Sequence, residues 1–358
     1  MPDLLCIAEP DQLAALPTNG LAAIAPELLV QHAPDAHWVL VQGDYLLSYC
    51  SLWWHQVPPD PKHKLGLIGH YGALNEAAAE EILTYACQQL AGQGCTFAIA
   101  PIDGNTWRRY RAISDLQGEF KELSSEPVFF LEPENPLSWC QHFTQAGFEP
   151  IAQYYSAINT DLSQQDERLA AVEARLAGRV QIRPLHRDRL DAELQAIYQL
   201  SLTSFRHNFL YTPIAKAEFL AQYRQILPYL RSELVLMAEQ QGQLVGFVFA
   251  VPDLLQAQRG EAITTVILKT VAVLPGRAFA GLGNLLVARC QTIAQQLGYT
   301  RVIHALMHET NHSRNLSRRY AEPIRRYTLF GQTLKVKGNT DLGNTDLERC
   351  DKSDKRLR

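Results

Sequence analysis

Residues 271–284 read Val-Ala-Val-Leu-Pro-Gly-Arg-Ala-Phe-Ala-Gly-Leu-Gly-Asn. An apolar, strand-like run ends at Pro275-Gly276, and Leu282 then opens a series of apolar residues at helical spacing. Glycine lets a backbone approach a ligand closely, and the free N–H groups and dipole of a helix N-terminus favour negative charge. The segment therefore predicts a strand, an anion-binding loop and a helix, with Arg277 adding a full charge. A tight turn without a ligand is the plainer alternative.

Apolar runs on both sides of this segment follow a recurring order. In the second half, the order strand, strand, strand, helix, strand is predicted for 234–238, 244–251, 263–274, 282–297 and 302–307. The first half repeats it about 200 residues earlier, at 38–41, 45–54, 65–74, 77–90 and 96–102. The two halves share little identity, so the repeat is one of pattern and predicts two similar domains.

The wider pattern resembles the GNAT superfamily of acyl-CoA N-acyltransferases. Their motif reads V-x-P-x-x-R/Q-G-x-G-I/L-G and precedes a helix; the residues that fall on it without insertion are Val273, Pro275, Gly281, Leu282 and Gly283. Two positions depart from it, because Ala278 stands at the basic or Gln position and Phe279 at the first Gly. Arg277, one place earlier, is expected to substitute for the basic residue.

The resemblance implies a site for acetyl-CoA or a longer acyl-CoA. It assigns to that site Val271, Ala272, Val273, Arg277, Ala278, Phe279, Ala280, Gly281, Leu282, Gly283, Asn284 and, after the next strand, Asn311. Glu309 and His304 are the candidates for the base that deprotonates the acceptor amine, and Tyr320 for the acid that protonates the leaving thiolate. Each has a structural alternative: a solvated charge for Glu309, a buried hydrogen-bonded imidazole for His304, and packing for Tyr320.

The same resemblance implies an α/β fold of the α+β type, with two GNAT-like domains that each contain a central mixed β-sheet flanked by helices. The expected domains are 1–160 and 180–337, with a helix or polar linker at 161–179 and a polar tail at 338–358. Where the first half should carry the phosphate loop it reads Gly-Ala-Leu-Asn-Glu-Ala, and Glu76 and Glu80 would repel a pyrophosphate. We therefore expect only the second domain to bind acyl-CoA.

The composition and charge of the chain limit the classes of partner that it is expected to bind. With 33 basic and 37 acidic residues the formal net charge is −4, which argues against nucleic-acid binding through phosphates. No apolar run reaches the length of a membrane span, and the start lacks a basic n-region, so a cytoplasmic protein is expected. The sequence predicts an N-acyltransferase whose acceptor is an amine-bearing small molecule or peptide, and it leaves the oligomeric state open.

Two other functions stay open. His308-Glu309-Thr310-Asn311-His312 spells H-E-x-x-H, the signature of zinc hydrolases, in which both histidines lie on one helix face. The run before it is strand-like, and Thr and Asn are poor helix formers, so the context argues against a zinc site. A GNAT-like binding protein without catalytic activity is the other alternative. Lys269, alone within an apolar run, needs a partner that the sequence does not identify.

Overall fold

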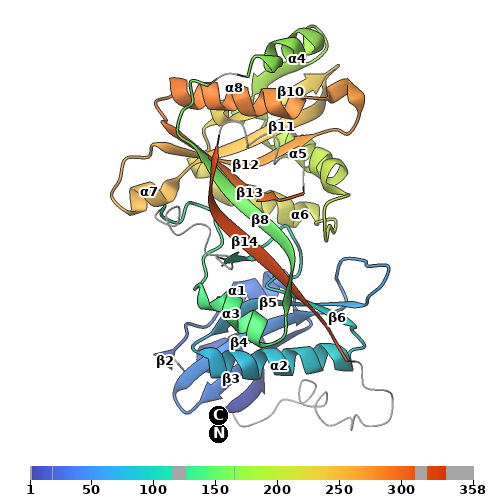
Figure 1. Ribbon diagram of the computed structural model, residues 1–358, viewed down its shortest axis with the longest axis vertical. Coiled ribbons are helices and arrows are strands. Elements are labelled where there is room, and N and C mark those ends of the chain that lie inside the picture. The colour runs from blue at the N-terminus through green and yellow to red at the C-terminus, as the bar shows by residue number, and fades with distance from the viewer. Residues whose placement is uncertain (1, 18, 115–125, 165, 311–320, 336–358) are drawn as a thin grey trace. The chain divides into compact units, whose positions relative to one another are not determined.

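The computed structural model describes residues 2–17, 19–114, 126–164, 166–310 and 321–335, and they form two compact units (Figure 1). Unit 1 comprises Met1–Ser114, Asn135–Ala152 and Thr328–Arg358, and unit 2 comprises Asp115–Glu134 and Gln153–Tyr327. The chain therefore visits each unit more than once, whereas the domains expected from the sequence were contiguous. Among the described residues, no helix has the length and apolar character needed to cross a membrane.

Unit 1 contains a mixed sheet in the order β1-β3-β4-β5-β6-β14. Its strands are β1 (Asp3–Cys6), β3 (Ala36–Gln42), β4 (Tyr45–Trp53), β5 (Leu65–Ala73), β6 (Phe97–Ala100) and the end of β14 (Glu322–Thr333). The shorter elements are η1 (Pro10–Ala15), β2 (Asn19–Gly20), α1 (Pro26–His32), β7 (Ala112–Ser114) and α3 (Ser138–Gln145). Only the β5–β6 pair among these neighbours is parallel, as expected for a chain that crosses over through a helix.

That crossover helix is α2 (Glu76–Gly92), which covers part of the unit 1 sheet (Figure 1). Asn75 caps its N-terminus, and the side-chain oxygen of Asn75 accepts the N–H of Ala78 at 2.9 Å. Apolar side chains at helical spacing, including Ile82, Leu83 and Leu90, are fully buried against the strands. The sequence pattern that predicted a helix at 77–90 thus reflects a real amphipathic helix.

Unit 2 repeats the plan with the sheet order β14-β8-β13-β12-β11-β10-β9. Its strands are β8 (Glu149–Asn159), β9 (Gln181–Pro184), β10 (Val235–Gln240), β11 (Gln243–Pro252), β12 (Thr265–Val273) and β13 (Arg301–His308). Its helices are α4 (Arg168–Leu176), α5 (Leu190–Phe205), α6 (Lys216–Ile226), α7 (Leu254–Gln258) and α8 (Leu282–Gln296), with the short turns η3 (Arg187–Arg189), η4 (Leu227–Tyr229), η5 (Ser232–Leu234) and η6 (Arg277–Phe279). The predicted α/β fold, with mixed sheets flanked by helices, is confirmed.

Alternation along β11 explains how the helices of unit 2 are divided between the two faces of its sheet. Val248 and Ala250 belong to the apolar cluster that includes Leu282, Leu286 and Val287 of α8. Phe249 points the other way, and its ring lies edge-on to that of Tyr223 in α6, at 4.8 Å between centroids. Helix α8 therefore packs on one face, and α5 and α6 pack on the other.

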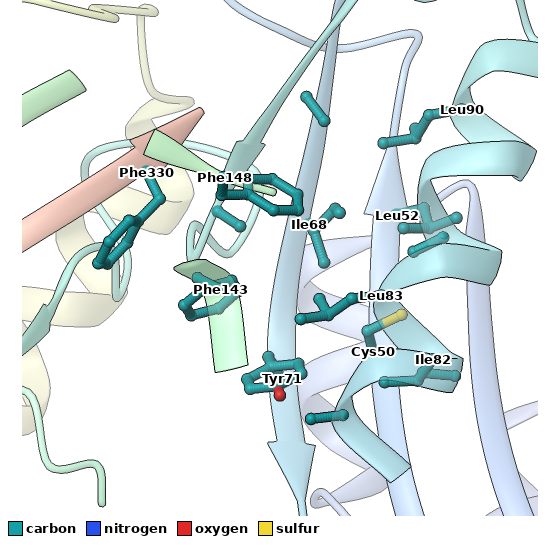
Figure 2. Close-up of a cluster of buried hydrophobic side chains, with 14 of the residues drawn as sticks. Cys50, Leu52, Ile68, Tyr71, Ile82, Leu83, Leu90, Phe143, Phe148 and Phe330 are labelled. Carbon is teal, nitrogen blue, oxygen red and sulfur yellow. The ribbon is translucent and has the colours of Figure 1, made fainter. Parts of the chain in front are cut away.

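Each unit takes a strand from the opposite half of the sequence. β8 starts in unit 1, but its later residues pair antiparallel with β13 in unit 2, from Val302↔Asn159 to His308↔Tyr154. β14 starts in unit 2, and its last residues pair antiparallel with β6 in unit 1, from Phe330↔Ala100 to Thr333↔Phe97. Figure 2 shows Phe330 of β14 among the buried side chains of unit 1, beside Phe143 and Phe148.

Candidate functional site

The site is built where two parallel strands of unit 2 separate. β12 and β13 pair from Thr265↔Arg301 to Leu268↔His304, and no pair is formed beyond that point in the described chain. β12 then continues beside β11 alone, up to Gly246↔Val273, while β13 continues beside β8. The edge of β12 from Lys269 to Val273 is therefore not used for pairing with β13, although the hydroxyl of Ser204 donates to the carbonyl oxygen of Val273 at 3.1 Å.

The loop after β12 leaves a set of backbone N–H groups without acceptors. Gly276 and Gly281 have φ of 134° and 81°, values that side-chain-bearing residues rarely adopt. A Cβ on Gly281 would lie 2.9 Å from Cγ2 of Val172, so glycine is also required by space. The amides of Gly281, Leu282, Gly283 and Asn284 make no hydrogen bond to any described residue. Four such donors at the start of a 15-residue helix suit an anion such as a pyrophosphate.

The other side of this loop is held by α4, which lies within the segment 161–179 that the sequence left as a helix or a linker. Arg175 of α4 donates to the carbonyl oxygen of Ala278 at 3.4 Å and to that of Ala280. Leu176 is buried against α8, and Glu173 forms an ion pair with Arg289 of α8. Arg277 is exposed and forms no ion pair with any described residue, so its charge is available to a ligand.

His304 is buried and has a hydrogen-bond partner in α8. Its Nε2 lies 2.8 Å from Nε2 of Gln291 in α8, and Oε1 of Gln291 accepts from Nδ2 of Asn159 at 3.1 Å. Burial lowers the pKa of His304 from 6.5 to about 4. This network lies in the layer between the sheet and α8, so the geometry favours the packing alternative for His304 over the role of base.

Glu309 lies just beyond the end of β13. Its N–H donates to the carbonyl oxygen of Gln153 at 3.1 Å, and its carboxylate forms an ion pair with Arg326 of β14. The ring of the preceding residue, His308, lies edge-on to that of Tyr154, with 4.7 Å between centroids. The centroid of the Phe209 ring, in the loop between α5 and α6, lies 6.3 Å from that of His308. Asn311 and Tyr320 lie outside the described residues.

The rival zinc motif begins on a strand. His308 is the last residue of β13, and its Nδ1 accepts the N–H of Thr310 at 3.1 Å in a local turn. A zinc hydrolase needs its two motif histidines on consecutive turns of one helix. Asn311 and His312 lie outside the described residues, but the observed start of the motif differs from that requirement.

Lys269 was left without a role by the sequence. A register shift between Phe249 and Ala250 places Lys269 in a bulge of β12, at the point where β13 diverges. Its ammonium lies 5.1 Å from the centre of the Tyr223 ring, and no carboxylate of the described residues pairs with it. Burial lowers the pKa of this lysine from 10.5 to about 8. The cation–π contact with Tyr223 is a weak partner for a charge in this position.

Unit 1 fills the corresponding place with its own chain. β5 and β6 also separate after Leu67↔Ile99, but the N–H of Ile102 then donates to the carbonyl of Ile68 at 2.8 Å. A Cβ on Gly69 would lie 2.2 Å from the carbonyl oxygen of Ile102. Close contacts thus occupy the edge of β5, whereas the edge of β12 in unit 2 is not used in this way.

Comparison with known proteins gives a family match within the second half of the chain. Residues 194–321 match the model described as Acetyltransferase (GNAT) family. No curated protein matches the chain. One similar solved structure is a GCN5-related glucosamine N-acetyltransferase region of a fungal multi-domain GH3 beta-N-acetylglucosaminidase, with 12% identity and a TM-score of 0.54. A second is a conserved protein of unknown function and probable N-acyltransferase from Enterococcus faecalis V583, with 11% identity and a TM-score of 0.53. A third is a GCN5-related N-acetyltransferase from Anabaena variabilis ATCC 29413, with 10% identity and a TM-score of 0.50.

These likenesses extend over nearly the whole chain. They cover 93%, 94% and 93% of it, and 38%, 73% and 74% of the respective structures. The chain thus spans well under half of the fungal structure's length. At such low identities the likeness concerns the fold alone.

Proposed function

Since residues 194–321 form a domain of the GNAT acetyltransferase family, we propose that the chain transfers an acetyl or longer acyl group from acyl-CoA to an amine. The observation that carries this proposal is the combination of two features on one continuous segment. The edge of β12 from Lys269 to Val273 does not pair with β13, and the loop that follows leads to unbonded amides at Gly281–Asn284. One ligand with a thioester at one end and a pyrophosphate at the other would use both.

In the proposed reaction, N–H groups along Val271–Val273 polarise the thioester carbonyl, as preorganised donors do for other acyl transfers. The amine nitrogen attacks the carbonyl carbon, the C–S bond breaks, and the thiolate leaves. Glu309 is the proposed acceptor of the amine proton, directly or through water, because it follows β13 at the end where the strands have separated. Tyr320 is proposed to protonate the thiolate, and Asn311 to contact the acyl-CoA.

The acceptor amine is proposed to enter beside the aromatic side chains of Phe209, Tyr154 and His308. These three rings lie close to one another, and Phe209 is 45% exposed. An exposed ring at the mouth of a site suits an acceptor with an apolar or extended body. Glucosamine belongs in the first set of amines to be tried, because the similar fungal structure carries that name.

Acetyl-CoA binding, measured by calorimetry, tests the cofactor site. Gly281→Ala places a Cβ against Val172 and strains a left-handed residue, so we expect binding to weaken by about tenfold or more. Gly298→Ala is the matched control, since Gly298 has φ of 91° at the other end of α8 and has open space around it. Absence of binding by the unmodified chain at millimolar acetyl-CoA would contradict the proposal.

Thiol release from acetyl-CoA in the presence of a panel of amines tests the transfer itself. We expect Glu309→Gln to lower kcat by about a hundredfold while acetyl-CoA binding is kept, because removal of a general base acts on the chemical step. Binding without thiol release for any amine would favour the alternative of a GNAT-like binding protein without catalytic activity.

A further inference from the structure

A partly buried cluster of two imidazoles and one carboxylate belongs to unit 1, whereas the residues assigned to acyl transfer belong to unit 2. His32 ends α1, His70 lies in β5, and Asp103 follows β6. Nδ1 of His32 lies 2.7 Å from Nε2 of His70, and Nε2 of His70 lies 4.0 Å from Oδ2 of Asp103. One donor atom from each residue lies within 4.8 Å of the other two. From this juxtaposition we propose that unit 1 binds a divalent transition-metal ion, of which Zn²⁺ is the type, between His32, His70 and Asp103.

The outer partners of His70 fix its orientation in the way that metal-binding histidines require. Nδ1 of His70 lies 2.9 Å from Oγ of Ser51, and that Oγ lies 2.8 Å from Nδ1 of His37. When the hydroxyl of Ser51 donates to His37, Nδ1–H of His70 donates to Ser51. The lone pair of Nε2 then faces His32 and Asp103. The Ser51–His37 pair therefore provides the second layer of hydrogen bonds for a ligand imidazole.

The two carboxylate oxygens of Asp103 have different partners, one being a backbone N–H and the other the proposed ion. Oδ1 accepts the backbone N–H of His70 at 2.6 Å, which leaves Oδ2 directed toward the imidazoles. His70 has φ of 42°, a strained value for a residue with a side chain. The Asp103 hydrogen bond holds this conformation. Strain that is maintained by a specific partner is a common property of functional sites.

His32 is anchored through its backbone. Its carbonyl oxygen accepts from Nε1 of Trp53 at 3.0 Å and from Nη1 of Arg108 at 3.0 Å. The Trp53 ring also lies edge-on to the His70 ring, with 5.2 Å between centroids. The two imidazoles are thus held near each other by surrounding side chains, so little ordering is left to be done when an ion binds.

Charge acts on this site in both directions. The carboxylate of Asp103 attracts a dication, and its Oδ2 lies 4.0 Å from Nε2 of His70. The guanidinium groups of Arg108 and Arg109 oppose a cation. We therefore expect weaker binding than at a closed four-ligand zinc site, with a coordination position open to water or an anion.

Binding requires a small adjustment of the rings. Two ligands of a tetrahedral zinc ion lie about 3.3 Å apart when each bond is about 2.05 Å, so the 2.7 Å contact between His32 and His70 has to widen. The present contact is a hydrogen bond in which the imidazoles share one proton. Zn²⁺ would take the place of that proton, and His32 would then carry its one proton on Nε2.

The metal content of the full chain tests the proposal. The purified chain is stripped with a chelator, incubated with Zn²⁺ or Co²⁺, desalted and analysed by elemental mass spectrometry. We expect one retained zinc ion per chain, a visible absorption band with Co²⁺, and loss of both in His32→Gln and Asp103→Asn. His55→Gln is the matched control, because His55 is an exposed residue of the same unit whose Nδ1 lies 2.8 Å from Asp35. It should retain the ion.

Two further variants keep the outcome interpretable. His308→Gln removes the first ligand of the H-E-x-x-H sequence, and loss of zinc only in this variant would overturn the assignment. Ser51→Ala keeps all three donors and removes the bond that orients His70, so we expect about 10–100-fold weaker Zn²⁺ binding. Circular dichroism without metal shows that each variant folds, and Zn²⁺ should raise the Tm of the parent but not of His32→Gln. Retention of zinc in both His32→Gln and Asp103→Asn, or its absence from the parent, would refute the site.

Discussion

The charge of Lys269 has an electrostatic cost in unit 2, because a bulge in β12 places its ammonium beside the Tyr223 ring without a carboxylate partner among the described residues. Its pKa is lowered to about 8, so above that pH the folded chain loses a proton that the unfolded chain keeps to about 10.5. The unfolded state then binds more protons, and stability rises with pH through this window. Lys269→Met removes the cost, and we expect it to stabilise the chain at pH 7 by about 1 kcal/mol, discounted because the residue is half-buried.

The measurement is the difference in Tm between Lys269→Met and the parent at pH 7, 8, 9 and 10. The gain should be largest at pH 7 and should shrink as the pH approaches 10. Lys216→Met, which replaces an exposed lysine of α6, is the control and should show no such trend. A difference that does not change with pH would mean that the Lys269 ammonium is well paired in the folded chain.

At single residues, the alternation of apolar and polar side chains predicted burial, whereas the pairing of residues between neighbouring strands could not be predicted from the sequence. The period-2 pattern around His304 favoured a buried, hydrogen-bonded histidine, and Gln291 is the partner that the structure supplies. The bulge at Lys269 left no mark in the sequence, because a bulge is defined by which residues of the neighbouring strand lie opposite. The sequence also showed no sign of the His32–His70–Asp103 cluster, because its members are far apart in the chain and only folding brings them together.

At the scale of elements, α4 supports the loop that precedes α8. Arg175 donates to two loop carbonyls, while the amides of Gly281–Asn284 are left without acceptors among the described residues. Arg175→Ala removes hydrogen bonds of an exposed side chain, each worth about 0.5–1.5 kcal/mol, so we expect about 3–10-fold weaker acetyl-CoA binding. Calorimetry measures the change. Arg168→Ala, on the same helix, is the control and should leave the affinity unaltered; equal losses in both variants would point to a general charge effect.

The sequence predicted the elements of this region better than their contacts. The strand, the glycine loop and the helix at 271–297 were all expected, and β12, η6 and α8 form there. The segment 161–179 was left undecided because its composition is mostly polar. Yet Leu169, Val172 and Leu176 recur at helical spacing, and Val172 closes the space beside Gly281. A narrow apolar stripe was enough to dock α4 on a loop that is itself partly apolar.

At the scale of the whole molecule, the repeat of two similar halves was visible in the sequence, but the exchange of strands was not. β8 is the last strand of the first repeat and β14 is the last strand of the second. Both strands have long runs of buried residues, so either one could pair within either sheet. The alternating pattern specifies which face of a strand is apolar, and it does not specify which sheet receives the strand. The contiguous domains expected from the sequence therefore differ from the observed units in the segments that contain these two strands.

The exchange predicts that one strand stabilises two units separately. Phe330 is fully buried in unit 1 and stacks on Phe143 at 5.4 Å, whereas Ile324, earlier on β14, is buried in unit 2. Phe330→Ala should lower the stability of unit 1 by about 3–5 kcal/mol, and Ile324→Ala that of unit 2 by about 2–5 kcal/mol. Hydrogen exchange distinguishes them, because the first variant should lose amide protection in α2 and the second in α8. Equal loss in both helices for either variant would show that the two units unfold together, and that a strand contributed by the other half of the sequence couples them into one cooperative system.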